Sequence, residues 1–104
     1  MIIDLNGNLV AAAEARLDPF DRGFTLGDAI FESLRVRDGA PEFAAEHLAR
    51  LTQSSTVTGI PLPFTQDQAL DRMARLTDAN KMTDAALRLT VSRGAAARGV
   101  AAPK

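Results

Sequence analysis

Residues 29–43 read AIFESLRVRDGAPEF, and this pattern predicts a β-strand, a tight turn and a returning strand. Side chains of a strand alternate between its two faces, so residues 29–37 have an apolar face and a polar face. The apolar face carries Ile30, Leu34 and Val36, and the polar face carries Phe31, Ser33, Arg35 and Arg37. Glu32 is the one charged residue on the apolar face. Asp38-Gly39 favours a turn, after which Pro41–Phe43 is expected to return as a second strand.

Two shorter segments precede this strand. Asn6-Gly7-Asn8 separates the apolar residues 1–5 from residues 9–11, and an Asn-Gly turn between two such segments predicts a β-hairpin. Residues 17–28 combine Pro, Gly and Asp, a composition that interrupts regular structure, so we expect a loop there.

Two helices follow the strands. The first is expected over Ala44–Thr58, because Gly59 is typical of the residue that ends a helix. The second begins at Thr65, whose spacing to Gln68 is that of a capping box, and it stops near Asn80.

A last strand is predicted over residues 86–93, where Leu87, Leu89 and Val91 alternate with polar residues. The residues that follow are expected to form a loop. No internal repeat or Ser- or Pro-rich linker divides the chain, so residues 1–104 are expected to form a single domain. Its predicted class is α+β, with a mostly antiparallel sheet covered by two helices.

Composition excludes several classes of protein. The chain has 104 residues, 46% of them hydrophobic, which is enough for one core. Lys and Arg total 12 against 13 Asp and Glu, so binding to nucleic acid is not favoured. No apolar run approaches the roughly 20 residues that cross a bilayer, and the N-terminus lacks a signal-peptide pattern. We therefore expect a soluble, cytoplasmic protein that does not bind membranes.

Few side chains are available for chemistry. The chain has one histidine, two lysines and no cysteine, tyrosine or tryptophan, so no metal site is predicted, and His47 is expected to be structural. Asp18, Asp21 and Asp28 are interpreted as turn and cap residues rather than paired catalytic acids. Arginines beside a Gly-rich loop suggest capture of an anion such as a phosphate or a carboxylate, but exposed arginines more often belong to a solvated surface.

Three ordered blocks carry a family resemblance. They are DRGFTLGDAIFE at residues 21–32, EHLARL at 46–51, and SRG at 92–94 followed by Arg98-Gly99. Together they resemble the N-terminal domain of class IV (fold-type IV) pyridoxal-phosphate enzymes, which include branched-chain and D-amino-acid aminotransferases and aminodeoxychorismate lyase. The resemblance covers essentially the whole chain.

The resemblance implies an enzyme that binds pyridoxal 5′-phosphate between two domains. Arg50 matches the arginine that contacts the cofactor phosphate, Phe31 an aromatic residue of the substrate pocket, and Arg98 a loop arginine that meets a substrate carboxylate. From the residues alone, the alternative interpretations are a surface arginine for Arg50, a core residue for Phe31 and a frayed tail for Arg98.

A departure from the family concerns its Schiff-base lysine, which lies in the C-terminal domain. The two lysines here, Lys81 and Lys104, match no family motif, so this chain carries no predicted catalytic residue and is expected to be inactive alone. The resemblance therefore implies two partners, the missing C-terminal domain or fragment and a second subunit in a homodimer.

The third block bears on the reaction. Ser-Arg-Gly-x-x-x-Arg-Gly resembles 4-amino-4-deoxychorismate lyase, which eliminates pyruvate from a small amino substrate to give 4-aminobenzoate for folate synthesis. Val100 stands where D-amino-acid members have a histidine, which disfavours that substrate class. Two alternatives remain open, a branched-chain-type or other class IV aminotransferase and a non-catalytic orphan domain.

Overall fold

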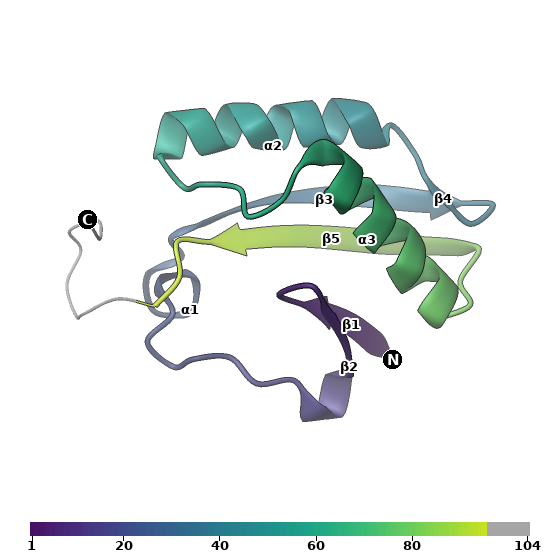
Figure 1. Ribbon diagram of the computed structural model, residues 1–104, viewed down its shortest axis with the longest axis horizontal. Coiled ribbons are helices and arrows are strands. Elements are labelled where there is room, and N and C mark those ends of the chain that lie inside the picture. The colour runs from purple at the N-terminus through teal and green to yellow at the C-terminus, as the bar shows by residue number, and fades with distance from the viewer. Residues whose placement is uncertain (96–104) are drawn as a thin grey trace.

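The computed structural model describes residues 1–95 of the chain. Figure 1 shows two long strands with two helices packed beside them, and a separate small hairpin. In chain order the elements are β1 (Ile2–Leu5), β2 (Asn8–Ala11), the short 3₁₀ helix η1 (Ala12–Glu14), α1 (Arg22–Leu26), β3 (Ala29–Arg37), β4 (Ala40–Pro41), α2 (Ala44–Thr58), α3 (Gln66–Ala79) and β5 (Asp84–Ser92). The predicted α+β class is confirmed.

Strand β3 lies at the centre of an antiparallel sheet with the order β4-β3-β5. Its register with β5 runs from Ala29↔Ser92 to Arg37↔Asp84. The predicted alternation along β3 is confirmed, because every second residue is buried. The sheet therefore has one face covered by helices and one face open to solvent.

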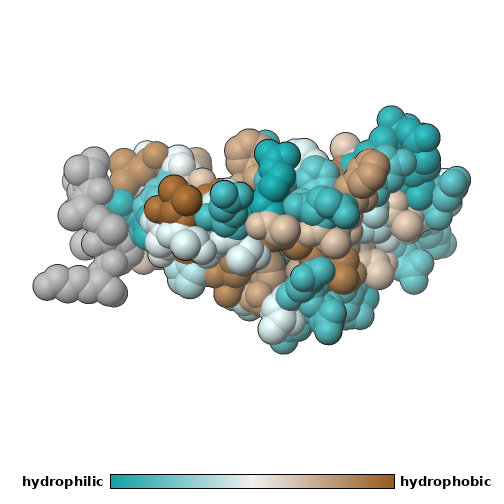
Figure 2. Space-filling model, turned by 90° about the horizontal axis from the view of Figure 1, so that it is seen from above, coloured by the Kyte–Doolittle hydropathy of each residue, from teal (hydrophilic) through white to brown (hydrophobic). Residues whose placement is uncertain are grey.

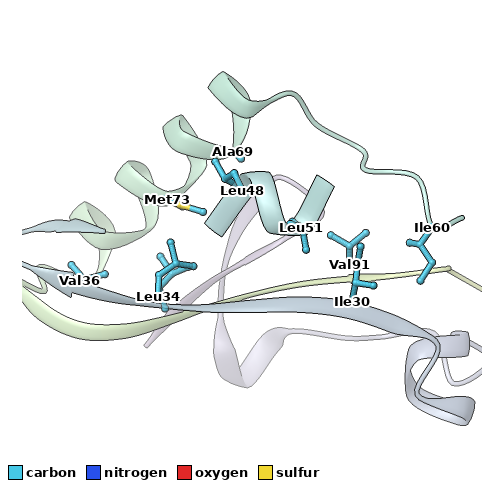
Figure 3. Packing of buried hydrophobic residues seen from close by; sticks show 10 residues of the cluster. Ile30, Leu34, Val36, Leu48, Leu51, Ile60, Ala69, Met73 and Val91 are labelled. Atoms are coloured by element: carbon cyan, nitrogen blue, oxygen red, sulfur yellow. The ribbon is translucent and has the colours of Figure 1, made fainter. Parts of the chain in front are cut away.

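The core lies between the covered face of the sheet and helices α2 and α3. Figure 3 shows the apolar side chains of the strands and of both helices pointing toward one another. The buried residues are Ile30, Leu34, Val36, Leu48, Leu51, Ile60, Ala69, Met73, Leu87 and Val91. Seen from the side of α2, the surface mixes hydrophilic and hydrophobic side chains, as expected for a helix layer whose outer side faces water (Figure 2).

The predicted ends of the two long helices are confirmed. Helix α2 stops at Gly59, whose φ of 73° lies in the left-handed region that favours glycine. Helix α3 begins with the predicted capping box, in which the Gln68 amide donates to the Thr65 hydroxyl and the Thr65 amide donates to the Gln68 side chain. Asn80 is the C-cap of α3.

The predicted N-terminal hairpin is confirmed, and its strands are separate from the main sheet. Strands β1 and β2 make a two-stranded sheet of their own, which is attached to helix α3. Arg72 donates to both carboxylate oxygens of Asp4, at 2.7 and 2.9 Å, and Asn80 exchanges two hydrogen bonds with the backbone of Ile2. These polar contacts to α3 fix the hairpin without strand pairing to β5.

Three other boundaries differ from the prediction. Residues 17–28 are not all loop, because Asp21 caps the short helix α1. The return strand is Ala40–Pro41 rather than Pro41–Phe43, because Phe43 adopts a φ of 53° as the N-cap of α2. Strand β5 runs over Asp84–Ser92 and so starts two residues before the predicted residue 86.

The Asp4–Arg72 contact predicts a pH dependence of stability. The hydrogen bond from Arg72 lowers the pKa of Asp4 below its ordinary value of 3.8. A lowered folded-state pKa adds stability above the unfolded pKa, and that stability is lost as the pH falls through the folded value. We expect Asp4→Asn to lower the Tm at pH 7, and we expect the difference from wild type to shrink as the pH falls below about 4.

Thermal unfolding between pH 2 and pH 7 checks this prediction. Asp71→Asn is the matched control, because Asp71 is an exposed carboxylate on the same helix as Arg72. A Tm difference for Asp4→Asn that stays constant across this pH range contradicts the assignment.

Candidate functional site

Two of the three sequence blocks contact one another at the end of strand β5. One oxygen of the Asp21 carboxylate accepts a hydrogen bond from the Gly23 amide at 2.7 Å, which caps α1, and the other accepts from the Ser92 hydroxyl at 2.9 Å. Gly23 permits this approach, because a Cβ atom there would lie 2.7 Å from the Cβ of Ser92. Residues 21–23 and Ser92 thus form one joint between α1 and β5.

A second joint is built on Asp28. Its Oδ2 atom accepts hydrogen bonds from Arg22 Nε and from Arg93 Nε, both at 2.8 Å, and Arg22 is buried. The hydrogen bonds from Arg93 and then Arg22 lower the pKa of Asp28. Arg93 also donates to the carbonyl oxygens of Thr58 and Gly59 at the end of α2. Arg22 and Arg93 therefore connect α1 and the end of β5 to Asp28, and Arg93 also connects them to the end of α2.

The prediction that the three aspartates serve turns and caps is confirmed for Asp18 and Asp21. Asp18 accepts a hydrogen bond from the Phe20 amide, and Asp21 caps α1. Asp28 forms the ion pairs just described.

The open face of the sheet includes Phe31, Ser33, Arg35 and Arg37 of β3 and Asp84, Ala86, Arg88 and Thr90 of β5. Phe31 is 53% exposed, so the interpretation of Phe31 as a core residue is wrong. The guanidinium of Arg88 lies over the Phe31 ring, 4.1 Å from the ring centre. Arg35 and Arg37 pair with the carboxylates of Asp84 and Glu42.

Arg88 is a candidate that the sequence reasoning missed. The alternation along β5 places it on the polar face, but its position beside Phe31 depends on the register of β3 with β5. In that register Ser33 is opposite Arg88 and Phe31 is its diagonal neighbour. An aromatic ring with a cation above it can receive a substrate that has both an apolar part and a carboxylate.

Arg50 lies on helix α2, on the covered side of the sheet. Its Nε atom is 3.8 Å from Oε1 of Glu32, and its side chain is 72% exposed. His47, on the same face of α2, contacts the same oxygen through Nδ1 at 2.7 Å. The carboxylate is buried beneath these two residues. An exposed guanidinium on a rigid helix suits the binding of a phosphate group.

Phe31 and Arg50 are associated with opposite faces of the sheet. Phe31 and Glu32 are neighbours in β3, so their side chains point in opposite directions. Strand β4 pairs only with Val36 and Arg37, so within the described residues the edge of β3 nearer its start has no partner strand. Arg98, the third predicted site residue, lies outside the described residues 1–95.

Residues 1–95 contain no group of three or more side chains that could hold a metal ion. In the same part of the chain, no helix is both long and apolar enough to span a membrane.

Comparison with known families accounts for the three blocks. A model of the family "Amino-transferase class IV" matches residues 29–104. The chain belongs to the class IV aminotransferase family. Its small mixed fold with an antiparallel sheet is the fold of the small domain of this family.

Individual class IV relatives differ in their reactions. D-Alanine aminotransferase of Bacillus licheniformis is 36% identical over 98 residues, which are 94% of this chain and 35% of that protein. The structure of 4-amino-4-deoxychorismate lyase from Pseudomonas aeruginosa is 36% identical, with a TM-score of 0.73 over 86% of this chain and 32% of that one. Branched-chain amino acid aminotransferase from Escherichia coli, at 24% identity, shares the fold with a TM-score of 0.90 over 98% of this chain and 36% of that one. The chain thus spans about a third of the length of these class IV relatives.

Proposed function

We propose that this chain forms one wall of the cofactor and substrate site of a pyridoxal-phosphate-dependent class IV enzyme. The observation that carries the proposal is the position of Arg50, the residue that matches the family's phosphate-binding arginine. It presents an exposed guanidinium from a long helix, above a buried carboxylate. The class IV family membership of the chain supports the same assignment.

The residues of this chain would hold the cofactor and the substrate rather than perform the bond-breaking step. When bound, pyridoxal phosphate supplies an electron sink for reactions at an amino-bearing carbon. Arg50 would bind its phosphate through paired N–H groups. Phe31 and Arg88 would contact the apolar part and the carboxylate of a small amino substrate, and Arg98 is proposed to bind a substrate carboxylate as well.

The free edge of β3 explains how one ligand could use both groups. Phe31 and Glu32 are consecutive residues there, and their side chains point to opposite faces of the sheet. A cofactor beside this edge would meet Arg50 on the covered side, while its substrate would meet Phe31 on the open side. The lysine that binds the cofactor would come from the remaining two-thirds of the protein, so we expect the chain alone to be inactive.

The proposed reaction is that of 4-amino-4-deoxychorismate lyase, which would release pyruvate and form 4-aminobenzoate for folate synthesis. Two observations support it: the Ser-Arg-Gly-x-x-x-Arg-Gly pattern of residues 92–99, and the 36% identity to the lyase of Pseudomonas aeruginosa. The second candidate is an aminotransferase, supported by the 36% identity to D-alanine aminotransferase of Bacillus licheniformis.

Exposed apolar side chains near α1 fit a homodimer and a second domain as partners. Phe20, Phe24 and Leu26 are 56%, 72% and 46% exposed. Apolar surface of this kind on a small domain indicates contact with another domain or chain. We also propose that the protein is cytoplasmic.

An assay of the complete enzyme separates the two reactions. We expect it to release pyruvate from 4-amino-4-deoxychorismate with no oxo-acid acceptor added, because an elimination needs no second substrate. Strict dependence on 2-oxoglutarate would identify an aminotransferase instead. Absence of both activities and of bound pyridoxal phosphate would favour a non-catalytic domain.

A further inference from the structure

Glu32 is a charged residue on the covered face of the sheet. It is 8% exposed, and its neighbours on that face, Ile30 and Leu34, belong to the hydrophobic core. Burying a carboxylate is unfavourable unless cationic or hydrogen-bonding partners compensate for the lost water. The position of Glu32 therefore requires an explanation beyond packing.

Both of its partners come from one face of α2. His47 and Arg50 are three residues apart on this helix, which brings their side chains together. An ionised carboxylate only accepts hydrogen bonds, so the 2.7 Å contact requires that Nδ1 of His47 carries the hydrogen. His47 thereby satisfies Oε1 of Glu32, and the more distant Arg50 lies 3.8 Å from the same atom.

The contact with Arg50 adds little to stability. The Arg50 side chain is 72% exposed, and pairs that face water contribute only about 0.2–1 kcal/mol. The contact matters instead for the orientation of the Arg50 guanidinium. The Nε atom of Arg50 is the one that lies 3.8 Å from Glu32, and a guanidinium has a further edge, between its two Nη groups, that can bind two phosphate oxygens at once.

We propose that Glu32 is a positioning residue for phosphate binding, acting through Arg50. It draws the Nε edge of the guanidinium inward and leaves the Nη edge directed at the phosphate. This role rests on the proposed function of Arg50. The negative charge of Glu32 by itself would repel a phosphate, so charge and positioning predict opposite effects when Glu32 is replaced.

Titration of the 104-residue chain with inorganic phosphate, followed by NMR of the arginine side chains, tests the proposal. Glu32→Met fills a similar volume and accepts no strong hydrogen bond, so we expect its phosphate affinity to fall about threefold to fivefold. Glu32→Gln keeps an oxygen acceptor at the same place and should stay within about twofold of wild type. Arg35→Ala, which removes an exposed arginine on the other face of the sheet, is the control and should bind as wild type does.

Phosphate binding by Glu32→Met that equals or exceeds that of the wild type would overturn the positioning role. A measurement on the wild type is independent of how the variants fold: phosphate should shift the Nη resonances of Arg50 more than its Nε resonance, and the reverse would also overturn the role.

Arg50→Ala separates this inference from the proposed function. If Arg50→Ala binds phosphate as tightly as wild type, the phosphate site itself is wrongly placed. If Arg50→Ala loses binding while Glu32→Met retains it, Arg50 keeps its proposed function and only the role of Glu32 fails.

Discussion

Arg22→Ala is expected to lower the free energy of unfolding by about 2 kcal/mol, because it removes a buried side chain that donates to a carboxylate, while Asp28 keeps its second partner, Arg93. Arg22 is only 4% exposed, and its Nε atom donates to Asp28 at 2.8 Å. Its backbone amide also donates to the carbonyl of Gly94, after the end of β5. The alanine variant keeps this backbone hydrogen bond and loses the side-chain contact with Asp28, which joins α1 to the residue before β3.

Thermal unfolding checks this expectation. For a domain of this size, about 2 kcal/mol corresponds to a Tm decrease of roughly 8–16 °C. Arg35→Ala is a matched control, because Arg35 also pairs with an aspartate, Asp84, at 2.9 Å, but both side chains are more than half exposed. The control should lose less than about 1 kcal/mol. Equal losses in the two variants would show that burial of the Arg22–Asp28 pair does not matter for stability.

In the complete enzyme, Arg50→Ala is expected to weaken the binding of pyridoxal phosphate about tenfold to a hundredfold, the range for losing hydrogen bonds to a charged group. The Tm should change little, because the Arg50 side chain is 72% exposed. Binding of pyridoxal, which lacks the phosphate, should be unaffected. The variant should therefore lose the preference for the phosphorylated form.

Arg72→Ala is the control for this second experiment. Arg72 lies on the other long helix, donates to both carboxylate oxygens of Asp4 and lies over the ring of Phe64. We expect Arg72→Ala to lower the Tm while retaining the wild-type affinity for pyridoxal phosphate. Equal affinities in Arg50→Ala and Arg72→Ala would remove Arg50 from the phosphate site.

The parts of the fold that the sequence predicted correctly depend on local rules. The alternation along β3, the glycine that ends α2 and the capping box of α3 each involve residues close together in the chain. The sequence does not predict helix α1, because the glycines and aspartates in and around it are typical of turns. It is stabilised by the Asp21 cap and by the contact with Ser92, which is distant in sequence.

The candidate site could be predicted only in part, for the same reason. Motif positions identified Arg50 and Phe31, and their roles remain predictions. The partner of each is not encoded locally: Arg88 reaches Phe31 through cross-strand register, and Glu32 meets Arg50 only when α2 packs on the sheet. The alternation along β3 shows that Glu32 is a charged residue on an apolar face, but it does not indicate which residues pair with Glu32. Arg98 stays a prediction outside the described residues.

The long-range pairings in this domain constrain the order in which it can fold during synthesis. The hairpin is made first, yet Ile2 exchanges its hydrogen bonds with Asn80. Strand β3 likewise pairs with β5, which is synthesised only after both long helices. Because a growing chain emerges from the ribosome N-terminus first, β1 waits for the end of α3, and β3 waits for β5, before they meet these partners. Contacts of such sequence separation slow folding, so the main sheet of the nascent domain cannot form until β5 has been made.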